Sequence, residues 1–570
     1  MPLRSFSQRS FFDPEFVSPS ILVQGTVPWL LGRYRSQLFP SWLFKGWRGE
    51  SKVGRKAWPA VVLTCLWLLR WTEEGMSRLA SVNRARTDLQ WRAAMGLECD
   101  IAPPSERTMR DFEKFLAQRH MAVDVPRYIL IHENIVRMCK EHDVVGDNPL
   151  WAIDSTPMYC YGAVLDTVRL LGDGLRQLGH RWARGTRRTL TEVAELWGLP
   201  LLLAKSTKGY PPVRPHGPAA PTAPSPPPSP AGWLDVDWRD RDARADVLEQ
   251  LGDHVVRLVA WVRRRLSEVR PGFRKGILRR CRNLLKVVSN DLEADAQGRL
   301  VLARHVARDR LVSMTDPQAR HGRKSKKRLF NGFKINVLGD LVSGLIASVT
   351  VTKGNQHDGT PTHRLVRRAK ALFDDIEQVL GDTAYGGTRA RHEIKQTLGV
   401  NLLTPPPQDT HKKKGTGAKS NFNIDFEAET ATCPRGFTTD EYKIVNHSEH
   451  NLPAYRYKWP RQTCEACPLN AECLGRGNCS KSLLLHPLEQ EMRTYRAAWQ
   501  NPEVKQEYRR RGEFERLIHS VTRHGGRQAR TWGLTAANIQ AHGIVTTSNL
   551  RLLAKALAEA NRTSEIALAA

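Results

Sequence analysis

LFNGFKINV (Leu329–Val337) and GLIASVTVT (Gly344–Thr352) are two runs in which apolar residues alternate with polar or small ones. Gly339-Asp340 lies between them and supplies residues that favour a turn, so the two runs predict a β-hairpin with one buried face. Residues 363–377 then carry apolar side chains at roughly helical spacing, with basic residues opposite. This pattern predicts an amphipathic helix packed on the hairpin.

A short apolar segment, Val379-Leu380, follows this helix and ends on Asp382 and the Gly-rich loop TAYGG. Open α/β sheets present functional groups at the ends of such strands. An ordinary turn residue is the alternative interpretation of Asp382. Residues 148–156 (NPLWAIDST) repeat the pattern, because an apolar run again ends on an aspartate, Asp154. Two strand-terminal aspartates with the same local pattern favour a shared functional site.

The composition indicates a polyanionic partner. The chain has 570 residues, with 87 Lys and Arg against 58 Asp and Glu, which gives a net charge of +29. Such a balance favours nucleic acid, with an anionic membrane surface as the rival. No run of 18 apolar residues occurs and the first residues lack an apolar signal core, so we expect a cytoplasmic protein. Ten cysteines in this length do not resemble a secreted disulfide scaffold.

Two regions are expected to be mainly helical. Residues 54–120 alternate apolar stripes with Arg and Glu, and Ser105 is a candidate N-cap. They fit either a DNA-binding head or an ordinary bundle with a solvated basic face. Residues 163–310 form the second region, and its basic stretch 257–286 has the same two interpretations. Ten prolines between 211 and 230 interrupt it, which predicts an extended linker over about 205–232.

A basic arm precedes the hairpin. Six of the nine residues from Arg320 to Arg328 are Lys or Arg. Because the arm leads directly into the first strand, we favour phosphate contacts over a merely solvated loop. The candidate DNA-binding residues of this arm are Arg323, Lys324, Lys326, Lys327 and Arg328.

Cysteines cluster between positions 433 and 479. The C-x-x-C pair Cys464 and Cys467, with further cysteines nearby, is typical of structural zinc sites, whereas four thiolates leave no open position for catalysis. Free thiols are the alternative. We expect the zinc ligands to be Cys433, Cys464, Cys467 and Cys473, although Cys479 could replace Cys473.

Residues 501–524 predict one long helix, with Asn501 as N-cap and Pro502 at its first position. Tyr508, Arg511 and Glu515 are spaced by three and four, so they share a helical face, and Thr522 follows seven residues later. Taken alone, these could be ordinary solvent-exposed side chains of a surface helix.

Together these segments resemble a known family. AIDST with Asp154, the MTDPQARHGRKSK and FNGFKINV runs, VTKGNQHDG, LGDTAYGG, the cysteine knuckles and YRRRGEFERLIHSVTRHGG occur in the same order in bacterial insertion-sequence DDE transposases. The chain is most similar to members with a Tyr-Arg-Glu-Lys helix signature, of the subgroup conventionally numbered eleven-eighty-two. The resemblance spans roughly residues 50–555. The Lys of the signature is replaced by Thr522, with Arg523 beside it.

The resemblance implies a ribonuclease-H-like mixed α/β sheet in which Asp154, Asp382 and Glu515 are the catalytic, metal-binding triad. It also implies that Tyr508, Arg511 and Arg523 contact DNA, and that at least a homodimer acts, because two element ends must be paired. Three carboxylates suit hard cations, and two Mg²⁺ (or Mn²⁺) ions can assist both the attacking and the leaving oxygen of a phosphodiester. His357-Asp358 is expected to support the site rather than to bind metal.

The expected function is that of a transposase that cuts the terminal inverted repeats of an insertion sequence and joins the ends to target DNA. A ribonuclease-H-like nuclease without strand transfer is one rival, and a catalytically dead DNA-binding protein is another. The expected division is an N-terminal extension (1–50), a helical DNA-binding domain (51–145), a first core strand (146–162), a helical insertion (163–310), the catalytic core (311–404 and 496–555), a Cys-rich insertion (405–495) and a tail (556–570).

Overall fold

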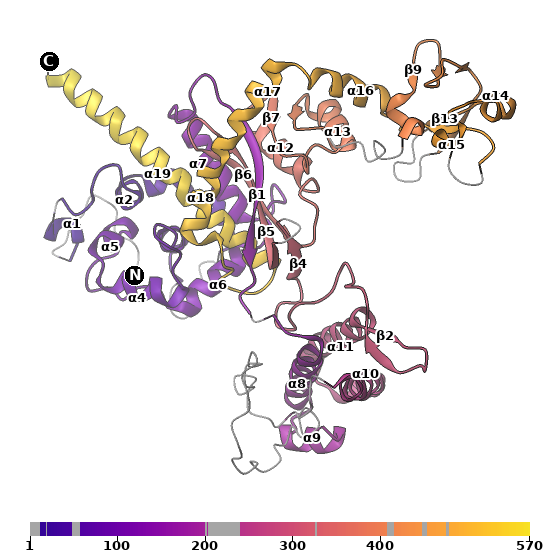
Figure 1. Ribbon diagram of the computed structural model, residues 1–570. Helices are drawn as coiled ribbons and strands as arrows, with labels where there is room; N and C mark the ends of the chain where they lie inside the picture. Colours follow the sequence, from indigo (N-terminus) through magenta and orange to yellow (C-terminus); the bar gives the residue numbers. More distant parts are fainter. Residues whose placement is uncertain are drawn as a thin grey trace, which may run out of the picture.

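A central sheet with helices on both faces organises the molecule, and two smaller lobes project from it (Figure 1). The computed structural model describes residues 12–18, 20–47, 57–162, 164–199, 202, 240–324, 328–406, 415–446, 453–474 and 478–569. The whole of the expected proline-rich linker 205–232 lies outside these residues, as do Lys326 and Lys327 of the basic arm.

The sheet has six strands of mixed direction. They are β1 (Trp151–Tyr159), β4 (Arg320–Arg323), β5 (Leu329–Asp340), β6 (Ile346–Lys353), β7 (Gln378–Leu380) and β8 (Asn401–Leu403). The order is β4-β5-β1-β7-β8, and β6 also pairs with β5. β5 runs antiparallel to β1 and β6, whereas β7 is parallel to β1 and β8. The expected hairpin is therefore confirmed as β5–β6, and the mixed sheet is consistent with a ribonuclease-H-like core.

Asp340 fixes the turn of this hairpin. Its side chain is fully buried and accepts hydrogen bonds from the backbone N–H groups of Ser343 (2.7 Å) and Leu150 (2.7 Å). The second bond holds the start of β1 against the hairpin turn. A buried carboxylate that accepts several N–H groups is fully satisfied, so this residue organises the sheet rather than a site.

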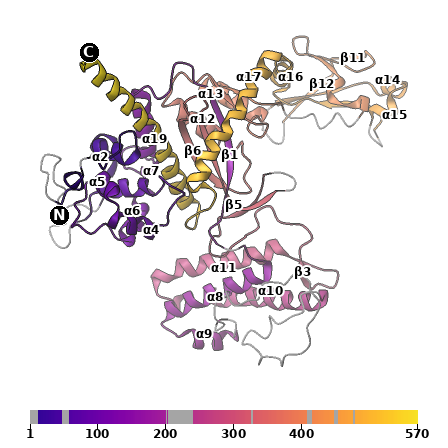
Figure 2. The same ribbon diagram turned by 60° about the vertical axis from the view of Figure 1, so that its left-hand side comes forward.

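Different helices cover the two faces of the sheet. α18 (Phe514–Val521) and the first part of α19 (Leu534–Ala569) pack on one face, in a core that contains Ala152, Val337 and Leu380. α12 (Thr362–Lys370), α13 (Thr388–Leu398) and α7 (Arg127–Glu141) cover the other face (Figures 1 and 2). α12 is the helix expected at residues 363–377, and it ends earlier than expected.

The N-terminal region is helical, as expected. Ser105 caps α6, since its hydroxyl accepts a hydrogen bond from the Thr108 N–H. The helices are α1 (Pro14–Val17), α2 (Val27–Leu38), η1 (Ser41–Phe44), α3 (Ala60–Leu69), α4 (Arg78–Thr87), α5 (Leu89–Met95), α6 (Glu106–Leu116) and α7.

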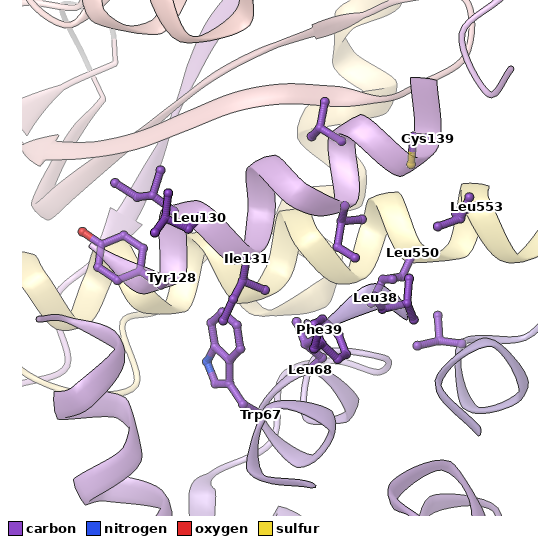
Figure 3. Packing of buried hydrophobic residues seen from close by; sticks show 14 of the residues in the cluster. Leu38, Phe39, Trp67, Leu68, Tyr128, Leu130, Ile131, Cys139, Leu550 and Leu553 are labelled. Atoms are coloured by element: carbon purple, nitrogen blue, oxygen red, sulfur yellow. The ribbon is translucent and has the colours of Figure 1, made fainter. Parts of the chain in front are cut away.

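These N-terminal helices share one core with the distant C-terminal helix. Ile131 of α7 lies among Leu38, Trp67 and Leu550, the last of which belongs to α19 (Figure 3). The segment 1–50, expected to be an extension, contributes α2 to the same core. The helical region and the sheet are thus joined through buried apolar surface, which is the dominant stabilising term in folding.

A helical bundle follows β1. It consists of α8 (Thr167–Thr186), α9 (Leu190–Trp197), α10 (Arg241–Arg264), η5 (Leu266–Glu268) and α11 (Pro271–Asp291), with a small hairpin of β2 (Leu292–Ala294) and β3 (Leu300–Leu302). Leucines and Trp182 form its own core. The bundle is one of the two projecting lobes, beyond the end of β1 (Figures 1 and 2).

The second lobe contains the cysteine cluster. It has two three-stranded sheets and a small core around Phe422 and Trp459. Its elements are η7 (Lys419–Asn421), β9 (Asn423–Asp425), β10 (Thr430–Thr432), β11 (Thr438–Thr439), β12 (Tyr442–Asn446), β13 (Pro453–Lys458), α14 (Arg461–Glu465), α15 (Asn470–Cys473) and β14 (Ser482–Leu484). α16 (Glu489–Ala498) leads from the lobe back to the sheet (Figure 1).

Residues 501–524 do not form the single helix that their spacing predicts. Asn501 caps α17 (Pro502–Arg509) as expected, but a 3₁₀ turn over Arg510–Glu513 precedes α18, and a π turn over Thr522–Gly526 follows it. Gly512 in the 3₁₀ turn and Gly525-Gly526 in the π turn have weak helical preference. Within these turns, the backbone leaves the helical conformation only at His524 and Gly525. No helix in the described part of the chain is long and apolar enough to cross a membrane.

Candidate active site

The sheet register places Asp154 and Asp382 side by side. Ala152 of β1 pairs with Leu380 of the parallel strand β7, and each aspartate follows its paired residue by two positions. Ala152 and Leu380 both belong to the core beneath α18. Because side chains alternate along a strand, two residues further on they point to the same face. Both carboxylates therefore face α17 and α18.

The glycines of the loop after Asp382 allow this loop to pack closely against Thr404. A Cβ on Gly386 would overlap the hydroxyl of the buried Thr404. The Asp382 carboxylate itself accepts a hydrogen bond from the Ala384 N–H (2.9 Å). The Gly-rich stretch of the sequence thus lets the chain turn sharply beside the second aspartate.

Asp154 lies in an unfavourable electrostatic environment. Burial raises the pKa of its carboxyl to about 6, and the charges of Asp382 and Asp358 contribute to this rise, whereas Arg511 opposes it. A buried carboxylate near other carboxylates is costly unless a cation compensates it. In the protein alone that cation is Arg511, whose Nη2 lies 2.8 Å from Asp154 Oδ2.

Tyr508 and Arg511 belong to this site. Tyr508 is half-buried and packs edge-on against Trp499, with ring centroids 5.1 Å apart. Burial raises the pKa of its hydroxyl, and the charges of Asp382 and Asp154 add to the rise while Arg511 lowers it. Two members of the predicted helix signature are therefore brought to the two aspartates.

Glu515, the third predicted acid, is exposed at the start of α18. It is not among the groups that influence the pKa of Asp154. Among the residues described, no three His, Cys, Asp or Glu side chains are arranged so that they could hold a metal ion. The assignment of Glu515 to a metal-binding triad stays a prediction.

The polar residues beside Asp154 include Lys334, which the sequence analysis did not single out. Lys334 of β5 is buried, and its Nζ donates to Asp358 Oδ1 (2.9 Å) and to the Gln356 carbonyl (3.0 Å). The same Asp358 oxygen accepts from the Ser155 hydroxyl (3.1 Å), next to Asp154. The interpretation of Asp358 as a supporting residue fits these contacts. The signal that could have found Lys334 is a lysine within an apolar strand pattern.

At the end of α18, Thr522 occupies the position where the signature has a lysine. Thr522 is buried, and its hydroxyl donates to the His519 carbonyl (3.1 Å). Its side chain therefore does not face solvent as a phosphate-binding lysine would. Arg523, the next residue, is exposed.

The basic arm forms an additional strand, β4, paired with the first part of β5. Arg320 is buried and bonds the carbonyls of Pro317 (2.7 Å) and Ala319 (2.8 Å), so it supports the fold. Arg323, Lys324 and Arg328 are exposed where the two strands meet. These three remain available to a phosphate backbone, whereas Lys326 and Lys327 lie outside the described residues.

Four cysteines surround one small cavity in the second lobe. Cys433, Cys464, Cys467 and Cys473 line a cavity of about 30 Å³, which the exposed Cys479 does not line. Burial raises the pKa of the Cys473 thiol, Lys481 opposes this, and charge on the other three thiols adds to it. The Lys481 N–H donates to Cys464 Sγ at 3.4 Å. Within the described residues the thiols converge without forming a metal-holding arrangement.

The mixed sheet is consistent with a ribonuclease-H-like core, and it brings Asp154 and Asp382 together near its central strands. Residues 307–550 match the family model described as "Transposase DDE domain". This match supports an insertion-sequence transposase of the DDE type, and it covers Asp382, Tyr508, Arg511 and Glu515 but not Asp154. No curated protein and no solved structure matches the chain.

Proposed function

We propose that this protein is a DNA transposase that cuts the terminal inverted repeats of an insertion sequence and transfers the freed strands into target DNA. One observation carries the proposal. Asp154 of β1 lies beside Asp382, which directly follows the parallel strand β7, Arg511 pairs with Asp154, and residues 307–550 match the DDE transposase domain. The net charge of +29 suits a DNA substrate.

The two aspartates fit a divalent cation. They offer oxygen ligands, which Mg²⁺ and Mn²⁺ prefer. Burial, together with the charges of Asp382 and Asp358, raises the pKa of Asp154, and a bound cation would stabilise its ionised form. In the proposal Glu515 completes the ligand set when DNA is bound. Bound Mg²⁺ would neutralise charge on the phosphoryl oxygens and assist the nucleophile and the leaving group.

The protein's own groups position the DNA. Arg511, released from Asp154 when a cation takes its place, would contact the phosphate next to the cleaved bond. Tyr508 lies close enough to both aspartates to feel their charge, so its hydroxyl would orient the same phosphate. Arg523 and the exposed arm residues Arg323, Lys324 and Arg328 would neutralise further phosphates, as would Lys326 and Lys327. A homodimer in the bacterial nucleoid would pair two element ends.

The four cavity-lining cysteines would bind a structural zinc ion. Thiolates are the preferred ligands of such sites, and the N–H group that faces Cys464 Sγ suits a metal-bound sulfur. Zinc would hold together a lobe whose apolar core is small. This zinc has no part in the proposed reaction.

Cleavage of a duplex that carries the element's terminal repeat, with and without Mg²⁺ or Mn²⁺, tests the proposal. Asp154→Asn and Asp382→Asn should each reduce nicking by more than about a hundredfold while DNA binding persists. Asp374→Asn, at an exposed acid paired with Lys140, is the matched control and should cleave normally. Normal cleavage by the Asp382→Asn variant would refute the site.

Because Glu515 is exposed, the alternative function is that of a protein that binds DNA without cleaving it. DNA binding with no metal-dependent nicking in the wild type would favour this rival. If nicking occurs, a strand-transfer assay with labelled element ends separates a transposase from a nuclease that only cuts.

A further inference from the structure

One end of the helical bundle gathers an unusual density of positive charge. α8 and α11 pack antiparallel, since Gly174 faces Leu284 and Gly185 faces Val269 and Phe273. The end of α8, α9 and the α10–α11 connection therefore meet at one end of the bundle (Figure 2). We call residues 181–198 and 261–275 the bundle tip.

Some arginines of the bundle tip are structural. Arg270 Nη2 donates to the Arg184 carbonyl (2.6 Å), and Arg274 Nε donates to the Val269 carbonyl (2.7 Å). These bonds satisfy carbonyls that a helix end and a turn leave without a partner. They fix the geometry of the tip, so that the remaining side chains are presented from a rigid support.

The remaining charge is not balanced. The bundle tip contains ten basic residues and three acidic ones, Glu192, Glu195 and Glu268. Glu268 pairs with Arg265 (3.4 Å) and reaches Arg188 (4.0 Å), and Glu192 caps α9. Within the described part of the chain, no acid pairs with five exposed cations. These are Arg184, Arg187, Arg263, Arg264 and Lys275.

A solvated helical face ordinarily mixes charges of both signs, because like charges close together repel. The opposite end of the same lobe follows this rule. There Lys286 pairs with Asp309, Arg299 with Asp295 and Arg304 with Glu293. The contrast within one lobe indicates that the bundle tip carries its charge for a polyanion.

We propose that the bundle tip is a second DNA-binding surface, which contacts the phosphate backbone of the duplex held by the catalytic core. This inference rests on the proposed function. α8 has 20 residues, so it is about 30 Å long, the length of about nine base pairs of duplex.

The test compares two triple variants of the full chain. Arg184→Gln/Arg264→Gln/Lys275→Gln removes three unpaired cations of the bundle tip. Lys286→Gln/Arg299→Gln/Arg304→Gln removes the same charge from paired cations at the other end of the same lobe. Affinity for a 40-base-pair duplex is measured by fluorescence anisotropy over a range of salt concentrations, together with thermal unfolding of each variant.

The tip variant should bind about tenfold more weakly, and the slope of log affinity against log salt should become shallower by about 0.9 for each phosphate that the protein no longer neutralises. The control variant should bind like the wild type. Equal affinities and slopes for both variants would overturn the inference. If the glutamine variant does not fold, Arg184→Lys/Arg264→Lys/Lys275→Arg should retain the affinity and slope of the wild type, and weaker binding by that folded variant would count equally against a phosphate-binding role.

The DNA-binding surface at the bundle tip and the transposase function can be refuted independently. Unchanged DNA binding by the tip variant, with metal-dependent nicking intact in the wild type, removes only the second surface. Weaker binding by the tip variant, with no nicking in the wild type, removes the transposase and retains the surface. If the protein binds anionic lipid vesicles more tightly than the DNA duplex, the proposal that the bundle tip binds DNA is wrong.

Discussion

Arg511 and Asp154 are joined by a hydrogen-bonded ion pair of 2.8 Å although they are 357 positions apart. The pair connects the 3₁₀ turn between α17 and α18 to the central strand of the sheet. In the absence of metal and DNA, the Arg511 guanidinium therefore bonds one carboxylate oxygen of Asp154, which is a predicted metal ligand. A metal ion therefore has to compete with Arg511 for this carboxylate.

Arg511→Gln should have opposite effects on metal binding and on cleavage. Removing the guanidinium leaves Asp154 without its neutralising partner, so Mg²⁺ should bind about three- to tenfold more tightly in the absence of DNA. Nicking should nevertheless become slower, because the phosphate loses its positioning group. Titration calorimetry with Mg²⁺ and the nicking assay measure the two effects, and weaker Mg²⁺ binding by the variant would contradict this account. Arg516→Gln, on the same segment but bonded to the Leu341 carbonyl, is the control.

Glu515→Gln should abolish nicking without changing stability. Its side chain is exposed, so the free energy of unfolding should change by less than about 0.5 kcal/mol. Loss of a metal ligand should reduce nicking by more than about a hundredfold. Glu513→Gln, two residues away, is the matched control, and urea unfolding and nicking are measured for both. Wild-type nicking by Glu515→Gln would exclude it from the ligand set.

The cysteine variants decide both the presence of zinc and its ligands. Cys464→Ser and Cys473→Ser should each lose one equivalent of zinc per chain and lower Tm by about 5 °C or more, since metal binding contributes folding free energy. Cys479→Ser should retain the metal, because Cys479 is exposed and does not line the cavity. Elemental analysis of purified protein gives the metal content. Zinc-free wild-type protein, or zinc lost only from Cys479→Ser, would contradict the assignment.

Two buried histidines should make the protein sensitive to acid. His132 and His542 lie between α7 and α19 with ring centroids 5.8 Å apart. Burial lowers the pKa of His132 to about 4 and that of His542 well below its ordinary value, and Arg368 reinforces both shifts.

The sign follows from proton uptake. Below the ordinary pKa of 6.5 the unfolded chain protonates these histidines and the folded protein does not, so stability present at neutral pH is lost as the pH falls from 6.5 towards 4. Each histidine should contribute about 1.4 kcal/mol per pH unit in that window. His132→Gln should flatten the dependence of the unfolding free energy on pH, whereas His305→Gln, at an exposed residue, should not. An unchanged slope in His132→Gln would contradict this interpretation.

Asp154, expected at the end of a strand, lies within β1, which continues to Tyr159. The local patterns in the sequence were sufficient for the hairpin, for the strand that precedes Asp382, and for the N-caps Ser105 and Asn501. Each of these depends on neighbouring residues, where alternation and capping preferences act directly. The family resemblance implied that Asp154 and Asp382 converge, but the parallel pairing of β1 with β7 was not predicted. No local pattern specifies the register between strands that are more than two hundred residues apart.

Other features depend on tertiary contacts that spacing does not encode. Helical spacing suggested that Tyr508, Arg511 and Glu515 act together, but only Arg511 bonds an aspartate, and Glu515 is exposed at the start of α18. Asp358 and Lys334 meet only because β5 folds beside the loop after β6. Arg320 was counted within the basic arm, and its burial against two carbonyls is set by the strand pairing of β4.

The packing of α19 against α7 has a consequence for biosynthesis. Ile131 and Leu550 belong to one core, so about four hundred residues must be translated after the first partner before the second is available. At about 5–20 residues per second this delay is on the order of a minute. Throughout that interval the early helices expose an unfinished apolar surface to the cell, and we expect the nascent chain to depend on chaperones until its last long helix emerges from the ribosome.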